Sequence, residues 1–141
     1  MSFEAFMKRN KITKPNAKYA ATKSLVDENG KPLEWEIKAL STKEAEKIRE
    51  ACTFDVPLKG KPGMYRPKLN TDLYTAKMVV AAIVYPDLYD AALQNSYGVT
   101  TPEDLIMEMV DNPAEYMDLS TFIQEYSGFE TLQEKVDQAK N

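Results

Sequence analysis

The side chains that could do acid–base chemistry gather in one short stretch. Glu103, Asp104, Glu108 and Asp111 fall close together, and paired carboxylates can act as general acid and general base. The chain has no histidine, so the commonest general base and metal ligand is missing. The four carboxylates also occupy first-turn and outward-facing positions of an expected helix, where acids favour the helix dipole and solubility. We therefore expect no catalytic residue, no metal site and no cofactor, and predict that the chain is not an enzyme.

The single cysteine, Cys52, lies on the inner face of an expected helix over residues 43–53. No neighbouring residue marks it as a nucleophile, so it is expected to be a small buried hydrophobe. One cysteine permits no internal disulfide, which fits a reducing cytoplasm. Gly60-Lys61 lacks the residues that flank this pair in a phosphate-binding loop.

The net charge of −4 is unevenly distributed along the chain. Residues 1–25 carry +5, residues 26–85 carry +1, and residues 86–141 carry −10. No lysine or arginine falls between Lys77 and Lys135, where there are eleven acids. Such a gap can be a solvated acidic surface, but it favours a basic or amphipathic partner. It argues against nucleic acid, whose phosphates this half would repel.

Residues 70–84 are the stretch around which the chain must be organised. From Leu73 to Val84 the only charged side chain is Lys77, and the apolar positions leave no polar face. A helix that is apolar all round must be enclosed by other elements. A buried strand is the competing interpretation, because Ile83 and Val84 favour strands, but the run exceeds the usual strand length. We predict a central helix that Asn70 or Thr71 caps and Pro86 ends.

The other segments complete one α+β domain that is mostly α-helical, with an N-terminal arm and one β-hairpin followed by about five helices. The hairpin strands are expected over 19–26 and 33–40, around the turn at Asn29-Gly30. Further helices are expected over 43–53 and 88–97, and after Thr101 and Asn112. Residues 56–69 are rich in proline and glycine and read as a loop or an irregular hairpin. The expected divisions are an arm and tether over 1–16, a globular domain over 17–128 and a polar tail over 129–141. No apolar run is long enough to span a membrane.

Two groups of exposed apolar residues are candidates for binding a partner. The arm places two phenylalanines and a methionine on one face, which could cover its own domain or dock on a neighbouring copy. Two methionines in the acidic half lie off the aliphatic stripes of their helices. They either form an adaptable surface for basic amphipathic helices or fill a second packing layer. The candidate partner-binding residues are Phe3, Phe6, Met7, Met107, Glu108, Asp111, Glu115 and Met117.

Three stretches carry a resemblance to a known family: SFEAFMKRNK at the N-terminus, the segment VDENGKPLEWEIKALSTKE, and PDLYDAALQNSYGVTTPEDLIMEMVDNPAEY. Over nearly the whole chain the sequence resembles the XkdN-like tail assembly chaperones of contractile-tailed phages and PBSX-like defective prophages. The resemblance implies a cytoplasmic protein, absent from the mature virion, that binds the tape measure protein and helps recruit tail tube subunits. A virion component, such as a head–tail connector or tail completion protein, is the alternative.

The resemblance also bears on the end of the chain. Many tail assembly chaperones are made in two lengths, the longer after the ribosome slips back one nucleotide. The ending Ala139-Lys140-Asn141 can be encoded by a slippery A-AAA-AAC heptamer. The polar tail would then be a tether to a second domain. A guanine at the third position of either of the first two codons would exclude this hypothesis.

Overall fold

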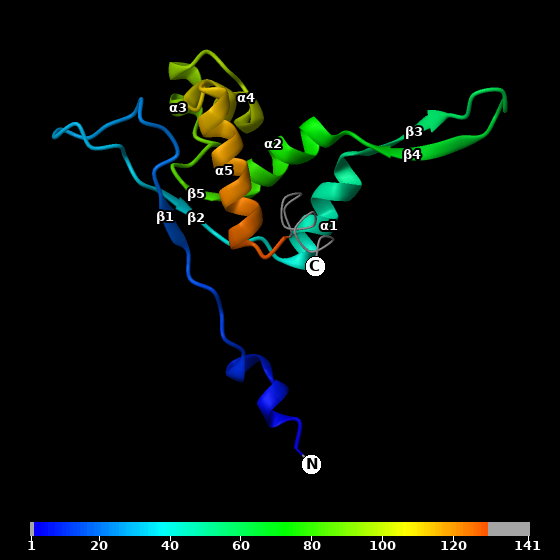
Figure 1. Cartoon of the computed structure of the whole chain (residues 1–141), viewed down its shortest axis with the longest axis horizontal. Helices are drawn as coiled ribbons and strands as arrows, with labels where there is room; N and C mark the ends of the chain where they lie inside the picture. The colour runs from blue at the N-terminus through cyan, green and yellow to red at the C-terminus, as the bar shows by residue number, and fades with distance from the viewer. Residues whose placement is uncertain (1, 130–141) are drawn as a thin grey trace, which may run out of the picture.

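A computed structural model describes residues 2–129 of the chain as an N-terminal arm and an α+β domain (Figure 1). The arm holds two short 3-10 turns, η1 (Glu4–Phe6) and η2 (Lys8–Asn10). The α-helices of the described residues are α1 (Thr42–Ala51), α2 (Thr71–Ala82), α3 (Ala91–Ser96), α4 (Pro102–Met109) and α5 (Pro113–Tyr126). The strands are β1 (Ala17–Tyr19), β2 (Trp35–Ile37), β3 (Thr53–Pro57), β4 (Tyr65–Leu69) and β5 (Ile83–Tyr85).

Helix α2 is the central helix that the sequence predicts. It begins at Asn70, whose side-chain oxygen accepts a hydrogen bond from the backbone N–H of Leu73 at 3.1 Å. It packs against α1, α4 and α5, so it has neighbours on several sides. Its buried residues are Ala76, Met78, Val79, Val80 and Ala82. Burial around so much of the helix follows from its lack of a polar face.

The predicted end of this helix is wrong, because residues 83–85 form strand β5. Ile83 pairs with Ile37 of β2, and the backbone N–H of Lys38 donates to the carbonyl of Ala82 at 2.9 Å. Two physical effects favour the change. The β-branched side chains at 83 and 84 suit a strand, and a proline at 86 disfavours helical geometry in the residue before it. The chain therefore turns directly from the central helix into a three-stranded sheet of order β1-β2-β5.

The prediction of a mostly α-helical fold with one hairpin is also wrong. Of the described residues 2–129, 44 % are helical and 16 % are strand, and the five strands among them form two sheets. The second sheet is a hairpin of β3 and β4, paired from Thr53–Leu69 to Pro57–Tyr65. It covers the segment 56–69 that the sequence indicates as a loop or irregular hairpin, but its first strand begins earlier, at the last residue of the helix predicted over 43–53. Prolines are tolerated there because both strands of a two-stranded ribbon are edge strands. At an edge position that faces solvent, the missing N–H of proline costs no hydrogen bond between strands. Gly60 and Gly63 adopt the positive φ that the turn between the strands requires.

The turn of the first hairpin is as predicted, but its strands are shorter than predicted. Tyr19 pairs with Trp35 in an antiparallel ladder of three residues, and Val26 forms one isolated bridge with Pro32. Gly30 has φ 80° in the turn, as Asn29-Gly30 predicts. Between the ladder and the bridge the chain runs as a loop, in which Ala21 and Thr22 are buried.

The predicted starts of the helices at Ser41, Thr101 and Asn112 are confirmed. Ser41 and Glu44 form a reciprocal capping box, and Thr101 and Asn112 cap α4 and α5. Helix α3 is shorter than the predicted 88–97, since Asp90 caps it. Cys52 ends α1 and is buried, and this burial raises the pKa of its thiol. The core also takes the aliphatic stripes of α4 and α5, with Leu105, Ile106, Leu119 and Ile123 all fully buried.

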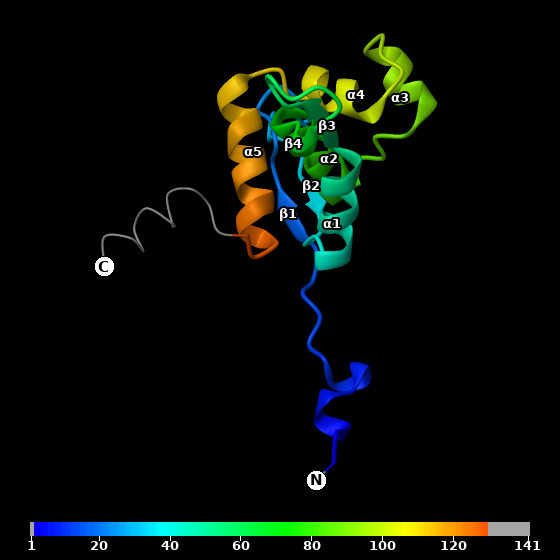
Figure 2. The ribbon, with the colours of Figure 1, turned by 90° about the vertical axis from the view of Figure 1, so that its right-hand side faces the viewer.

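The arm projects away from the domain in both views of the ribbon (Figures 1 and 2). Residues 2–16 are exposed throughout. The predicted polar tail lies outside the described residues except for Phe129. Within residues 2–129, no helix is both long and apolar enough to cross a membrane.

Removing buried volume from α4 should destabilise the protein strongly. Ile106→Ala is expected to lower the free energy of unfolding by about 2–5 kcal/mol, because the side chain is 0 % exposed and leaves a cavity. Met64→Ala, at an exposed position near the β3–β4 turn, is the control and should change it by at most about 0.5 kcal/mol. Urea denaturation measures both variants, and equal effects would contradict the assigned core.

Candidate partner-binding surface

A wide, open depression lies between the β1 side of the molecule and the start of α5. Its volume is about 780 Å³. Three carboxylates on it belong to the stretch from α4 to α5, and one lysine faces them from the loop after β1. We call it the acidic depression; it is lined by Tyr19, Ala20, Ala21, Lys23, Ser24, Asp111, Asn112, Ala114, Glu115 and Asp118.

Glu115 is the residue that joins the two walls of this depression. Its carboxylate accepts a hydrogen bond from the Thr22 hydroxyl at 2.8 Å and one from the backbone N–H of Lys23 at 2.9 Å. These bonds lower the pKa of the Glu115 carboxyl, the Lys23 N–H contributing most. A single carboxylate on α5 thus holds a loop more than ninety positions earlier in the chain.

An aromatic row continues this wall toward the end of α5. The rings of Tyr19 and Phe122 stack with centroids 4.4 Å apart, and those of Phe122 and Tyr126 stack at 5.6 Å. Burial raises the pKa of the Tyr19 phenol, and the negative charges of Asp118 and Glu115 raise it further. Stacking packs β1 against α5 through Tyr19, which also lines the depression.

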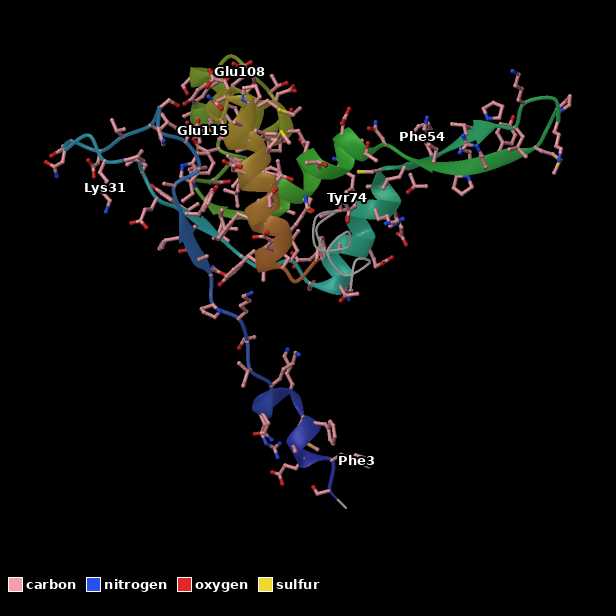
Figure 3. All side chains as sticks on the ribbon, viewed as in Figure 1. Phe3, Lys31, Phe54, Tyr74, Glu108 and Glu115 are labelled. Atoms are coloured by element: carbon pink, nitrogen blue, oxygen red, sulfur yellow. The ribbon has the colours of Figure 1, made fainter. Side chains whose placement is uncertain are left out.

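The candidate residues of the acidic half lie on α4, on α5 and in the turn between them. Met107 and Met117 are 46 % and 68 % exposed, so neither fills a gap in the core. Glu108 and Asp111 are exposed as well, and Figure 3 shows Glu108 and Glu115 on the neighbouring helices α4 and α5. Their role in binding a partner stays a prediction. Glu115 differs from the others because its carboxylate is already engaged within the fold.

The arm residues lie far from this region within the same chain. Phe3 and Phe6 are 74 % and 82 % exposed, and Figure 3 shows Phe3 near the tip of the arm, away from Glu108. Met7 is exposed too. The arm therefore adds nothing to the acidic surface of its own chain.

Two surfaces were missed by the sequence reasoning. The β3–β4 hairpin projects from the domain and exposes Phe54, Met64 and Tyr65 among basic side chains. The alternation of Phe54, Val56 and Leu58 was the available signal for its first strand. The second surface is an apolar groove of about 270 Å³, lined by Leu25, Leu33, Glu34, Trp35, Tyr85, Pro86, Leu93, Tyr97 and Met109. These residues come from separate segments, so no local pattern reveals the groove.

The arrangement of the acids supports binding better than acid–base or metal chemistry. Glu103, one of the four clustered carboxylates, forms an ion pair with Lys77 at 3.2 Å, so it is already partnered. Glu108 is exposed, and Asp111 is exposed as well, although it lines the acidic depression. In residues 2–129, no group of three or more Cys, Asp or Glu side chains is placed to hold a metal ion.

The fold is that of a small α+β protein with an exposed acidic surface and exposed apolar side chains. Comparison with known proteins makes this specific: the family described as phage XkdN-like tail assembly chaperone matches residues 3–140. The chain belongs to this family, and the resemblance seen in the sequence is confirmed.

Individual relatives agree with this assignment. The chain is similar to the phage-like element PBSX protein XkdN of Bacillus subtilis (strain 168), with 23 % identity over 137 residues, covering 96 % of this chain and 91 % of XkdN. Its fold is similar to the crystal structure of the protein YqbN, with a TM-score of 0.76 and 19 % identity. That match covers 92 % of this chain and 98 % of YqbN.

The anchoring role of Glu115 predicts a pH-dependent effect of Glu115→Gln. Because folding lowers the pKa of this carboxyl below its ordinary value of 4.5, its stabilising contribution is complete above that value and is lost as the pH falls through the folded-state pKa. The variant should melt below the wild type at neutral pH, and the difference should shrink on acidification. Thermal melts from neutral to acidic pH measure it. Glu108→Gln, at an exposed position, is the control, and a difference independent of pH would contradict the assigned role.

Proposed function

We propose that this chain is a cytoplasmic chaperone that binds the tape measure protein and helps recruit tail tube subunits during tail assembly. The observation that carries the proposal is the acidic surface of α4 and α5. Residues 102–126 contain seven acids and no lysine or arginine, and two exposed methionines lie among them in the sequence. Membership of the tail assembly chaperone family supplies the general role and tail proteins as its partners.

The chemistry of this surface suits a long helical client with basic and apolar positions. Methionine is unbranched and polarisable, so it adapts to different apolar side chains without a fixed pocket. Carboxylates around it attract basic residues and speed the encounter while adding little to affinity at the rim. Such a surface can hold many similar segments of one client in turn.

A structural role in the virion is the second candidate. The exposed N-terminal arm favours it, because an arm of this kind could lock a head–tail connector or tail completion protein to its neighbour. The two functions differ in whether the protein is present in the mature particle, because a chaperone is released before maturation. Mass spectrometry of purified particles separates them, since stoichiometric copies in mature virions would exclude the chaperone.

Reversing two exposed charges should weaken client binding without unfolding the protein. For Glu108→Lys with Asp111→Lys we expect about a tenfold loss of affinity for the tape measure protein, the equivalent of about 1.4 kcal/mol. Glu115 is left intact because its carboxylate anchors the loop after β1. A pull-down with the tape measure protein, followed by titration at two salt concentrations, measures the effect.

A second variant with two charge-reversing substitutions controls for the change in net charge. Glu46→Lys with Glu50→Lys reverses two exposed acids on α1, distant in sequence from the proposed surface, and should leave binding unchanged. Unaltered affinity in the variant with Glu108→Lys and Asp111→Lys, or equal losses of affinity in both variants, would refute the proposal that this surface binds the client. Met107→Ser with Met117→Ser tests the apolar part separately and should weaken binding at high salt as well.

A further inference from the structure

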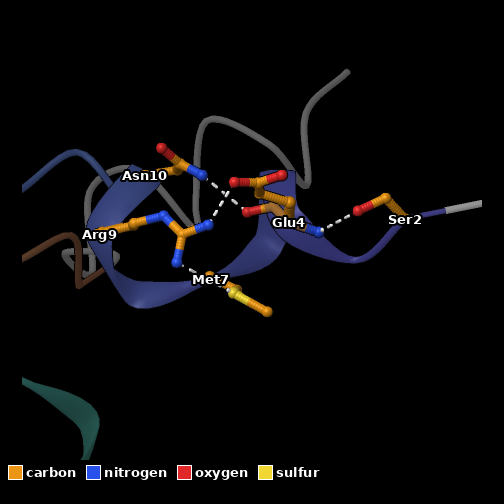
Figure 4. A network of polar contacts seen from close by, with 5 residues as sticks. All are labelled: Ser2, Glu4, Met7, Arg9 and Asn10. Atoms are coloured by element: carbon orange, nitrogen blue, oxygen red, sulfur yellow. Dashed lines mark hydrogen bonds and ion pairs between the residues drawn. The ribbon is translucent and has the colours of Figure 1, made fainter.

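The N-terminal arm is folded by contacts within itself (Figure 4). The carboxylate of Glu4 forms an ion pair with Arg9, and the side-chain amide of Asn10 donates to the Glu4 carbonyl at 2.7 Å. The Glu4 N–H in turn donates to the Ser2 hydroxyl at 3.1 Å. Within the described part of the chain, the hydrogen bonds of residues 2–12 stay within the arm. The two 3-10 turns are thus held in a compact shape without help from the domain.

This shape leaves the apolar side chains of the arm uncovered. Phe3 and Phe6 are almost fully exposed, and Met7 is exposed beside them. So short a helical segment is marginal in water on its own, and two neighbouring exposed phenylalanines carry a hydrophobic cost. A partner that covers them would remove that cost and stabilise the turns.

The base of the arm is fixed, which gives the arm a direction. Lys14 donates to the backbone carbonyl of Tyr126 at 2.7 Å and lies 4.0 Å over its ring. The Tyr126 hydroxyl donates to the Pro15 carbonyl. From this anchor the arm leaves the domain at the end opposite α3 in both ribbon views (Figures 1 and 2). It points away from the apolar groove, which α3 helps to line through Leu93.

The apolar groove is a suitable receptor for the arm. Its lining is almost entirely aliphatic and aromatic, with Trp35 at its base and Leu33 and Tyr85 partly exposed at its rim. About 270 Å³ is enough space for a phenyl ring. In an isolated chain this apolar surface faces water, as the arm does.

Charge complementarity favours the same pairing. Residues 2–14 of the arm carry a net charge of +3. The segments that border the groove carry acids at positions 27, 28, 34, 87 and 90 against Lys31, a net charge of −4. Opposite charges around an apolar contact steer the two surfaces together and fix their orientation.

We propose that the arm of one copy docks in the apolar groove of a second copy, with Phe3 or Phe6 inserted beside Trp35. Every chain carries one arm and one groove, and the two lie toward opposite ends of the domain. The contact is therefore heterologous, and repeating it produces a ring if the rotation closes and a chain if it does not. The proposal goes beyond the chaperone function and needs no client.

Light scattering on the purified full chain tests the self-association. The mass of the wild type should rise with concentration, whereas Phe3→Ser with Phe6→Ser should require about a tenfold higher concentration for the same mass. The matched control is Met64→Ser with Tyr65→Ser, which removes two exposed apolar side chains from the β3–β4 hairpin and should leave the mass unchanged. Melting temperature should stay the same in both variants.

A mixed crosslinking experiment tests the geometry. Phe6→Cys in one chain and Leu33→Cys in another, mixed and oxidised, should form a disulfide between residues 6 and 33. Cys52 stays in all samples because burial protects it. Phe6→Cys mixed with Lys47→Cys, an exposed position on α1, should not form a specific disulfide.

Several results would overturn the proposal. A wild type that is monomeric at every concentration would do so, as would a loss of mass in the hairpin variant equal to that of the arm variant. A lower melting temperature of the arm variant at unchanged mass would mean that the arm covers its own domain. A chain carrying both Phe6→Cys and Leu33→Cys that crosslinks only within itself would lead to the same conclusion. None of these measurements involves the tape measure protein, so they are independent of the proposed function.

Discussion

The structure depends on one constraint: α2 has no polar face and must be covered. Val79 and Ala82 are completely buried, and α1, α4, α5 and β5 all contact this helix. Chain order then limits how the cover can be built. The helix leads directly into β5, which completes the three-stranded sheet, and α4 and α5 close over it with their aliphatic stripes.

The same packing explains why one side of the molecule is acidic. Helices α4 and α5 bury their aliphatic stripes in the core, and every charged side chain at their remaining positions is an acid. Lys77, the last basic residue before position 135, comes from α2 and is paired with Glu103. No other base follows it in the described part of the chain, so the acids beyond Glu103 have little compensation. Packing therefore explains why these acids are exposed, and the lack of lysine and arginine in both helices makes the surface negative.

The extent to which the sequence predicted this structure depended on how local each signal was. Caps such as Ser41 with Glu44 act within one turn, and the buried stripe of Leu105 and Ile106 follows one helical period, so these predictions were right. Strand β5 was missed because its strand character depends on pairing with β2, more than forty residues earlier. The sequence does not distinguish a loop from a hairpin at β3 and β4, because prolines argue against strands unless both edges of the sheet are open.

How well the candidate surfaces could be predicted also depended on how local each signal was. The exposure of Met107 and Met117 could be read from their positions off the helical stripes. The anchoring of the loop after β1 by Glu115 could not be predicted, because its partners Thr22 and Lys23 are distant in the sequence. The apolar groove was invisible for the same reason, since Leu33, Tyr85 and Leu93 meet only in the folded chain.

The two proposed contacts use different residues, and this has a consequence for assembly. The acidic depression and the apolar groove share no lining residue, so one copy can receive an arm while its acidic surface stays open. Head-to-tail docking would then repeat the acidic surface at a regular spacing. Several weak sites held together bind a long client far more tightly than one site does, because each further contact forms at a high effective concentration. An elongated helical client is the kind of partner for which such an array is useful, and individual contacts that remain weak allow it to be released.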